Sequence, residues 1–462
     1  MAEHVLSSLA MLTEFFTTEH IEAAARRTGF VKRAAKITGK IFLALVTFGV
    51  WNDADTTLAQ LAAKVTQLDE QLEVSPEAMY QRMNKRALAF LQDLIGYALA
   101  KVPALEKVCD DGLFPAFTKV YLADSTGFEL PNSLHALFPG SGGSAAKAGA
   151  KMQAVWDYKS RVFAHCALTP WNLPDQKYVD IVVALAQKGI LFLFDLGYFK
   201  IKAFARIADA GAYFLSRLNH QTTILHAEAG SLQPLDLAAW LPTVADPCIE
   251  TPIFLGAQER VACRLVASRV PEPIVNARRR SAYKKAKKKG YPPSKAHLAL
   301  LAWNLLITNV PHTTWKTAAV LKAYPLRWQI ELLFKSWKSY RHVASIKTKK
   351  EDPTLCYLYG RMLLILLTYA LYPQRRATVW LKKKRELSVL KFVRHFQAWA
   401  DQWMHAIFQS ELALRRFLQR VCVTAERLAV KASRKRRTTA QILRESLNQH
   451  HESVACAAAV NA

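Results

Sequence analysis

The order of apolar and polar residues predicts an α/β protein between helical ends. From about residue 115 to residue 218, short apolar runs alternate with amphipathic segments. The expected strands are residues 119–124, 151–157, 161–168, 190–194 and 212–218, and the expected helices are residues 175–188 and 201–210. All of residues 190–194 are apolar, which is typical of a strand buried on both faces. We therefore expect a mixed sheet with helices packed on it.

Strong helix formers dominate the chain before this region. Thr57 offers a cap for a helix over residues 57–68, and Ser75 with Pro76 begins a second helix over residues 76–95. Near its start the second helix carries the polar residues Tyr80, Gln81, Arg82, Asn84, Lys85 and Arg86. The pair is either a helix-turn-helix that presents these side chains to a DNA major groove or an all-α packing module.

Between residues 219 and 300 the pattern changes to short β-like pieces, residues 253–257 and 261–270, followed by a basic run without an acid. The basic residues of this run are Arg278, Arg279, Arg280, Lys284, Lys285, Lys287, Lys288 and Lys289. We expect a mostly β insertion with a basic tongue, and a disordered loop is the alternative. Residues 303–309 resume a strand pattern, and residues 313–340 a helical one that Pro325 can break.

These patterns divide the chain into four regions. They are a helical region (residues 1–112), which is a DNA-binding domain if its helix pair is a helix-turn-helix, an α/β core (residues 113–218 and 300–374), the β-rich insertion with its basic loop (residues 219–299), and a helical, basic C-terminal region (residues 375–462).

The charge of the chain points to a polyanionic partner. There are 63 lysines and arginines against 36 aspartates and glutamates, a formal net charge of +27. Basic side chains near phosphates release condensed counterions, so nucleic acid is the expected partner. A membrane surface, an acidic protein or a merely solvated basic face are the alternatives.

Other features of the composition predict a protein of the cytoplasm. The seven cysteines form no CxxC pair, which argues against a disulfide framework and against a zinc ribbon. No basic signal-peptide start is present. The longest apolar runs, residues 41–51 and 362–372, are shorter than the ~20 residues of a membrane span. We expect buried helices there, and no membrane partner.

Two aspartates follow apolar strands. Asp124 ends the run at residues 120–123, and Asp195 ends the run at residues 191–194. A carboxylate in that position costs several kcal/mol of desolvation unless it is paired or binds a cation. Each aspartate could instead cap the turn or helix that follows it. After Asp195, Gly197 lets the chain turn sharply away from the sheet.

A third acid lies on a predicted helix. At about 100° per residue, one arc of roughly 80° contains Tyr324, Arg327, Glu331, Lys335 and Lys338. A second arc, which can face a core, contains Leu326, Ile330, Leu333 and Trp337. Arg327 and Lys335 could also be simple surface salt-bridge partners of Glu331, because each is four residues away from it.

The spacing of Tyr324, Arg327, Glu331 and Lys338 resembles the Tyr-Arg-Glu-Lys signature of transposases from the insertion sequence four family. Asp124-Ser125-Thr126 and Asp195-Leu196-Gly197-Tyr198-Phe199 look like the first and second acidic motifs of that family. The resemblance covers roughly residues 115 to 345. Leu196 is a departure, because family members often have a basic residue after the second aspartate.

The resemblance implies a ribonuclease H-like core interrupted by a β-rich insertion between the second aspartate and the glutamate. It also implies that Asp124, Asp195 and Glu331 form a catalytic triad that holds two Mg²⁺ ions, with Mn²⁺ as a substitute; hard oxygen ligands fit both metals. Such a pair of ions supports both strand cleavage and strand transfer. Tyr324, Arg327, Lys335 and Lys338 would bind phosphates of the transposon end.

Trp303 lies 28 residues before Glu331, close to the place where relatives of this family have a tryptophan that stacks on an extruded base. The alternative is a core residue of its strand.

The sequence therefore predicts a DNA transposase that acts on transposon ends and target DNA, as a homodimer in the synaptic complex, at the bacterial nucleoid. A DNA-binding regulator without catalysis and a metal-dependent nuclease of the same fold are the alternative functions.

Overall fold

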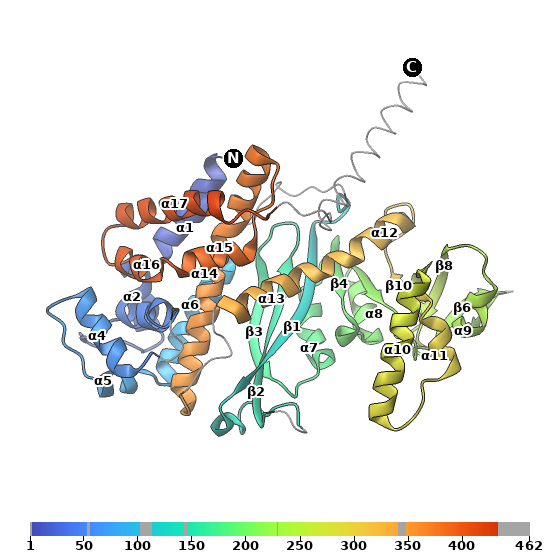
Figure 1. The fold of residues 1–462 in the computed structure, drawn as a ribbon, viewed down its shortest axis with the longest axis horizontal. Coiled ribbons are helices and arrows are strands. Elements are labelled where there is room, and N and C mark those ends of the chain that lie inside the picture. The colour runs from blue at the N-terminus through green and yellow to red at the C-terminus, as the bar shows by residue number, and fades with distance from the viewer. Residues whose placement is uncertain are drawn as a thin grey trace, which may run out of the picture. The chain divides into compact units, whose positions relative to one another are not determined.

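The computed structural model describes residues 2–52, 56–101, 113–142, 146–228, 230–340 and 348–432. Contacts between residues divide the chain into two compact units that do not follow chain order (Figure 1). Unit 1 consists of residues 1–109, 125–173 and 329–435, and unit 2 of residues 110–124, 174–328 and 436–462. The predicted four-region division is a separate hypothesis and stays a prediction.

Helices from both ends of the chain make up most of unit 1. Those from the N-terminal end are α1 (Ala2–Phe15), α2 (Thr18–Arg27), α3 (Gly39–Ala44) with the π-helical turn η1 (Leu45–Gly49), α4 (Leu58–Leu68), α5 (Pro76–Arg82) and α6 (Lys85–Lys101). Those from the C-terminal end are α14 (Glu351–Lys383), α15 (Val389–Gln397), α16 (Ala400–Ala406) and α17 (Glu411–Leu428). Blue and orange-to-red ribbons therefore lie together in Figure 1.

α14 is the central helix of this bundle. It has 33 residues and is apolar enough to pass a length and composition test for a membrane span, yet 89% of its apolar window is buried inside the protein. Such burial is typical of a core helix. Gly360 lets α14 approach η1, because a Cβ atom at this position would lie 2.3 Å from the carbonyl oxygen of Val46. The prediction of buried helices at residues 41–51 and 362–372 is confirmed.

The predicted helix starts in unit 1 are confirmed, and one predicted helix is wrong in length. The Thr57 hydroxyl accepts a hydrogen bond from the Gln60 amide in a capping box, and the Ser75 hydroxyl accepts one from the Ala78 amide. The helix expected over residues 76–95 is two helices, α5 and α6. Asn84 lies between them, and its side-chain oxygen accepts hydrogen bonds from the amides of Arg86 and Ala87 and so starts the second helix.

Unit 1 also contains a hairpin of β2 (Ala148–Asp157) and β3 (Phe163–Pro170), which is antiparallel as expected. Its strand order is β3-β2-β1. β1 (Lys119–Leu130) is longer than the predicted residues 119–124 and passes from unit 2 into unit 1. The apolar run stops at Ala123, but Thr126, Phe128 and Leu130 are buried at every second position, which continues the strand with one covered face.

A mixed sheet forms the centre of unit 2, in the order β1-β4-β5-β10-β9-β8-β6-β7. Its parallel part pairs β1 with β4 (Ile190–Phe194) and β4 with β5 (Tyr213–Arg217). The remaining strands are antiparallel: β10 (Trp303–Thr308), β9 (Val261–Arg269), β8 (Cys248–Leu255), β6 (Ile224–Glu228) and β7 (Ser231–Pro234). β6 to β9 therefore extend the sheet of this unit beyond its parallel part.

Short helices accompany this sheet. They are α7 (Asp175–Val183), which is shorter than the predicted residues 175–188, α8 (Ile201–Asp209), α9 (Leu237–Trp240), α11 (Lys295–Leu300) and α12 (Thr317–Ala323). After α12 the 3₁₀ turn η5 (Tyr324–Arg327) leads into α13 (Trp328–Tyr340), so the break expected at Pro325 is confirmed. The mixed α/β class predicted from the sequence is confirmed.

The basic run is not a loop. It lies in α10 (Glu272–Lys289), an 18-residue helix that ends at Gly290 with φ of 79°. Arginine, lysine and alanine are strong helix formers, and no glycine or proline interrupts the run from Arg278 to Lys289. A glycine with positive φ is a common helix end. Both loop interpretations of this segment, the tongue and the disordered loop, are therefore wrong.

Candidate active site

Three charged residues are level with one another where the parallel pairing of β1, β4 and β5 ends. Leu122 of β1 pairs with Leu193 of β4, and Leu193 pairs with Leu215 of β5. Asp124, Asp195 and Arg217 each follow their paired leucine by two positions. Neighbouring strands are about 4.8 Å apart, and residues separated by two positions face the same side of a sheet. The register therefore places two carboxylates and a guanidinium in one row at this edge.

Neither aspartate is a helix cap. Asp195 precedes the 3₁₀ turn η3 (Leu196–Tyr198), yet its side chain makes no capping hydrogen bond to that turn. Asp124 lies within β1, which continues to Leu130. The capping explanation offered by the sequence is therefore wrong for both residues, and the charge of each carboxylate needs another reason.

Arg327 forms an ion pair with Asp124 of this row. Its Nη1 lies 3.3 Å from Oδ2 of Asp124, and the exposed fractions of the two side chains are 6% and 17%. A buried ion pair of this kind offsets part of the desolvation cost of both charges. Arg327 was predicted to bind phosphates from an exposed helix face, but in this structure it is buried against Asp124.

Tyr324 lies against the strand that carries Asp195. Its hydroxyl donates a hydrogen bond to the carbonyl oxygen of Phe194 at 3.3 Å, and the guanidinium of Arg217 lies 5.7 Å from its ring centroid. Burial raises the pKa of the Tyr324 phenol, and the positive charges of Arg217 and Arg327 oppose that rise. Tyr324 therefore stays protonated at neutral pH and can act as a hydrogen-bond donor.

Asp175 adds negative charge near Asp195, and the pKa of Tyr198 reflects that charge. Burial raises the pKa of Tyr198 well above its usual value, and the carboxylates of Asp175, Asp124 and Asp195 add to this rise. The N-terminal end of α7 packs on η3, where a Cβ atom on Gly197 would lie 3.3 Å from Oδ2 of Asp175. Asp175 is thus a further carboxylate close to the pair.

A buried clamp fixes the loop that leads into η5. Arg264 of β9 pairs with Glu250 of β8 at 2.7 Å and donates hydrogen bonds to the carbonyl oxygens of Val310, at 2.6 Å, and Trp315. Glu250 also accepts a hydrogen bond from the hydroxyl of Thr317, at the start of α12. Burial alone would raise the pKa of Glu250, but its hydrogen bonds and the charge of Arg264 lower it below the usual range.

Glu331 lies in the first turn of α13, in unit 1, and is half-buried. Unit 2 contains Asp124 and Asp195, so the predicted meeting of all three acids stays a prediction. Within the described part of the chain, no three histidine, cysteine, aspartate or glutamate side chains are grouped to hold a metal ion.

The two arcs predicted around Glu331 differ in burial as expected at most positions. Lys335 and Lys338 are exposed. The opposite arc is buried at Leu326, Ile330, Leu333 and Trp337. Tyr324 and Arg327 are buried too, because η5 is a 3₁₀ turn and not part of the α-helix on which the 100° rule was applied.

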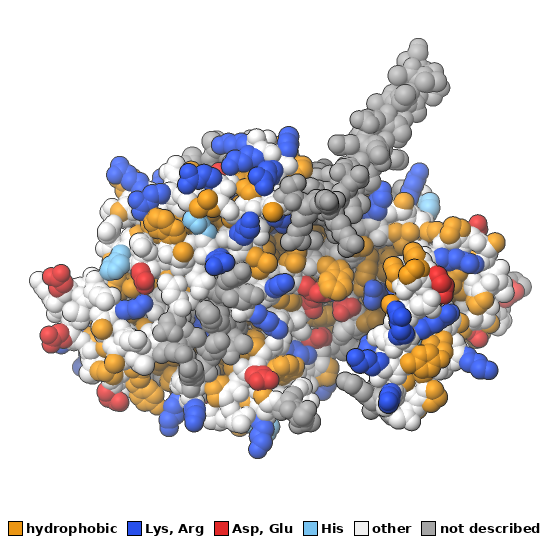
Figure 2. Space-filling model, viewed as in Figure 1, with side chains coloured by type: hydrophobic (Ala, Val, Ile, Leu, Met, Phe, Trp, Pro, Cys, Tyr) orange, Lys and Arg blue, Asp and Glu red, His pale blue; other side chains and the backbone are white. Residues whose placement is uncertain are grey.

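α10 contains the whole predicted basic run, and Lys and Arg side chains gather over it in Figure 2. Arg278 differs from the rest of the run, because it donates hydrogen bonds to the carbonyl oxygens of Leu301 and Trp303 and to Asn304. It therefore braces β10. Exposed members of the run are Arg280, Lys284, Lys285 and Lys287, and the side chains of Lys288 and Lys289 lie outside the described residues.

The two tryptophans near the site differ sharply in exposure. Trp303, the predicted stacking residue, is 6% exposed in β10, with the guanidinium of Arg269 5.0 Å from its ring centroid. Trp328 is 56% exposed and lies beside Arg327, whose guanidinium is 5.5 Å from its ring. Burial favours a core role for Trp303, whereas more than half of the Trp328 side chain is open to solvent.

Sequence reasoning missed Arg217, Asp175 and Trp328. Arg217 follows an apolar strand just as the two aspartates do, so the same signal was present in the sequence. Trp328 follows Arg327 directly and carried no pattern that distinguishes it from a core residue. The proximity of Asp175 depends on packing of α7, which no sequence spacing reveals.

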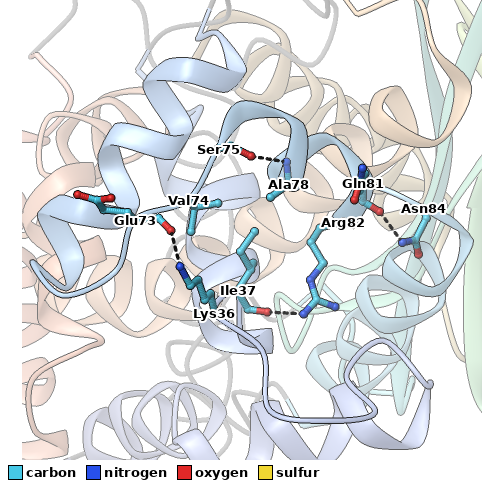
Figure 3. Close-up of a pocket in the computed structure, with 9 residues that line it drawn as sticks. All are labelled: Lys36, Ile37, Glu73, Val74, Ser75, Ala78, Gln81, Arg82 and Asn84. Atoms are coloured by element: carbon cyan, nitrogen blue, oxygen red, sulfur yellow. Dashed lines mark hydrogen bonds between the residues drawn. The ribbon is translucent and has the colours of Figure 1, made fainter.

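The predicted helix-turn-helix stays a prediction. A hollow of about 860 Å³ lies along α5 and is lined by Lys36, Ile37, Glu73, Val74, Ser75, Ala78, Gln81, Arg82 and Asn84 (Figure 3). Gln81 is exposed there. Arg82 is engaged inside the unit, because it donates hydrogen bonds to the carbonyl oxygens of Phe30 and Ile37.

Fold and site together define an α/β protein with two carboxylates that are level with each other where the parallel pairing of β1 with β4 ends. Residues 115–367 match the family model described as "Transposase DDE domain". The chain therefore belongs to the DDE transposase family, and the family membership predicted from the sequence is confirmed.

Relatives match over nearly the whole chain. The transposase for insertion sequence element IS231E of Bacillus thuringiensis subsp. finitimus is 26% identical over 89% of this chain and 89% of its own length. The transposase for insertion sequence element IS1151 of Clostridium perfringens is 26% identical over 93% of this chain and 94% of its own. A solved piggyBac transposase synaptic complex with hairpin DNA aligns with 94% of this chain and 87% of its own, at 10% identity and a TM-score of 0.45.

Proposed function

We propose that this protein is a DNA transposase that cuts the ends of its element and joins the freed 3′-hydroxyl ends to target DNA. The observation that carries the proposal is the level pair of Asp124 and Asp195 just past the parallel pairing of β1 with β4, in a chain of the DDE transposase family. The parallel strands β1, β4 and β5 with antiparallel additions support a ribonuclease H-like core. Residues 219–299 would be its insertion.

Asp124, Asp195 and Glu331 are the proposed ligands of two Mg²⁺ ions, with Mn²⁺ as a substitute. The donor chemistry fits, because these are hard carboxylate oxygens and two adjacent carboxylates repel each other unless a cation lies between them. Arg327 supplies one positive charge at Asp124. When bound, such ions activate an attacking oxygen and stabilise the departing 3′ oxygen.

The protein's own groups would position the DNA around this pair. Arg217, level with Asp195, is exposed and can bind a phosphate oxygen. Tyr324, held by the Phe194 carbonyl, orients the turn that carries Arg327. Arg327 can exchange its contact with Asp124 for a phosphate when the carboxylate binds a metal ion. Other basic contacts would come from Lys335, Lys338 and the exposed residues of α10.

Loss of Lys335 and Lys338 is expected to flatten the salt dependence of DNA binding. Each is exposed on α13, and each lost phosphate contact changes the log–log slope by about 0.9 unit. The double variant Lys335→Ala/Lys338→Ala should lower the slope by about two units when binding is measured by fluorescence anisotropy over a salt series. An unchanged slope would remove both residues from the DNA contact.

Trp328→Ala and Trp303→Ala are expected to fail in different ways. Removal of the exposed Trp328 should leave thermal stability nearly unchanged and lower cleavage by about tenfold, because stacking on a base contributes about 1–3 kcal/mol. Removal of the buried Trp303 should destabilise the protein by about 3–5 kcal/mol. Melting curves and cleavage rates of both variants test this. A Trp303→Ala protein that is stable but does not cleave DNA would indicate that Trp303, and not Trp328, stacks on a base.

The alternative functions are separated by one assay. Release and joining of a labelled element end are measured with Mg²⁺ for the wild-type protein and for Glu331→Gln. Release followed by joining, lost in the variant, supports the transposase. Release without joining supports a nuclease, and binding without release supports a regulator. We also propose that two copies pair the two element ends and that the protein acts at the nucleoid in the cytoplasm.

A further inference from the structure

Arg82 binds both ends of the loop between α2 and α3 in unit 1. Arg82 donates hydrogen bonds to the carbonyl oxygens of Phe30, at 3.1 Å, and Ile37, at 3.0 Å, and its guanidinium lies 5.2 Å from the Phe30 ring centroid. Figure 3 shows its bond to Ile37. The two ends of the loop are therefore fixed. Between them, Lys32 and Arg33 are exposed.

Two adjoining hollows lie beside this loop. The first, of about 690 Å³, is lined by parts of α2, the loop and α3, together with Phe408 and Gln409. The second, of about 440 Å³, lies between α16 and α17. Gln409 lines both hollows, so the two are neighbours, and we call them together the unit 1 groove.

The unit 1 groove is strongly basic. Its lysines and arginines are Arg26, Lys32, Arg33, Lys40, Arg416 and Arg420, and Glu22 is the only carboxylate among its lining residues. This ratio of six to one exceeds the 63 to 36 of the whole chain. Glu22 is itself engaged, because its Oε1 accepts a hydrogen bond from the backbone amide of Lys40 at 3.0 Å. Lys and Arg side chains also gather over α17 in Figure 2.

We propose that the unit 1 groove binds the phosphate backbone of duplex DNA, in addition to any contact made by α5. The proposal rests on the proposed function, and it names the surface that would hold the DNA outside the carboxylate site. The unit 1 groove brings together a loop near the N-terminus and α16 and α17 near the C-terminus. The sequence analysis assigned these segments to two separate regions.

The distribution of charge favours an extended polyanion over a small anion. The cations do not converge on one point: four line the first hollow and two, Arg416 and Arg420, line the second. Arg416 and Arg420 are one helical turn apart on α17, about 6 Å along its axis, and both are exposed. Exposed cations spaced along a groove bind a phosphate chain through counterion release and carry no base preference.

The test uses two double variants of the full-length protein, Lys32→Ala/Arg33→Ala in the loop and Arg416→Ala/Arg420→Ala on α17. Binding to a fluorescent 40-base-pair duplex of random sequence is measured by anisotropy at several salt concentrations. Each double variant is expected to weaken binding about tenfold or more and to lower the log–log salt slope by about two units. The combined variant should lower it by about four.

The matched control is Arg394→Ala/Arg427→Ala, which removes two exposed arginines of the same unit that line neither hollow. It should change the slope by less than half a unit. The charge-retaining variant Arg416→Lys/Arg420→Lys should keep the wild-type slope, and melting curves of all variants should agree with the wild type. Metal-dependent cleavage by both groove variants should return at low salt, because they leave the carboxylates intact.

Groove variants that bind like the control would overturn the groove proposal while leaving the transposase function standing. A change of slope in only one of the two double variants would also overturn the groove proposal. The two hollows would then not bind the same DNA. A wild-type protein that neither binds nor cuts DNA would instead remove the proposed function. A groove that binds only acidic proteins would also appear as unchanged DNA slopes and would overturn the proposal.

Discussion

Asp124→Asn and Asp195→Asn are each expected to lower DNA cleavage by about 10³-fold or more while DNA binding changes by less than about threefold. The two carboxylates are level with each other just past the parallel pairing of β1 with β4, and the proposed metal ions need their charge. An amide of the same shape keeps the packing but removes that charge. Cleavage of a labelled element end with Mg²⁺ measures the loss, and anisotropy measures the binding.

Asp180→Asn is the matched control. Asp180 is an exposed aspartate of α7 in the same unit, paired with Lys200 and Arg206 at 2.8 Å each. Exposed pairs contribute little to stability, so this variant should cut like the wild type. Cleavage at wild-type rates by either Asp124→Asn or Asp195→Asn would remove that residue from the site. Equal loss in Asp180→Asn would show a general sensitivity to lost negative charge.

Gly360→Ala is expected to destabilise unit 1 strongly. A Cβ atom at this position would lie 2.3 Å from the carbonyl oxygen and 2.9 Å from the carbonyl carbon of Val46, so two backbone segments would have to separate. Overpacking a core usually costs about 1–3 kcal/mol, and a clash with backbone lies at or beyond the upper end of that range. The melting temperature should fall by about 5 °C or more.

Gly96→Ala makes the same chemical change without the clash. Gly96 is an exposed residue of α6, and nothing lies within 4 Å of a Cβ built on it. Alanine in a helix interior is favoured over glycine by about 0.5–1 kcal/mol, so this variant should melt at or slightly above the wild-type temperature. A Gly360→Ala protein as stable as Gly96→Ala would contradict the close approach of α14 to η1.

Local patterns predicted the parallel strands well because each is a short apolar run with clear ends. β4 coincides with the five apolar residues 190–194. β1 was predicted too short, because its second half is buried on one face only and alternates with polar residues. The basic run was predicted as a loop because its charge was given more weight than its helix propensity. It is a helix because arginine, lysine and alanine favour helices.

The candidate site could be predicted in part. The strand-end positions of Asp124 and Asp195 were visible in the sequence, and the register of β1 with β4 makes them neighbours. The burial of Tyr324 and Arg327 could not be predicted, because it depends on the 3₁₀ geometry of η5 and on contacts with β1 and β4. Arg217 is level with Asp195 only because β4 pairs with β5. That pairing joins residues far apart in the chain, so it could not be predicted from local patterns.

The contacts of Arg264 and Glu250 limit how far the protein can be shortened. Glu250 belongs to β8 and Arg264 to β9, and both hold the loop from which α12 and η5 start. Excising residues 219–299 would therefore remove the contacts that align Tyr324 and Arg327. These strands are a structural part of unit 2 and not a detachable module.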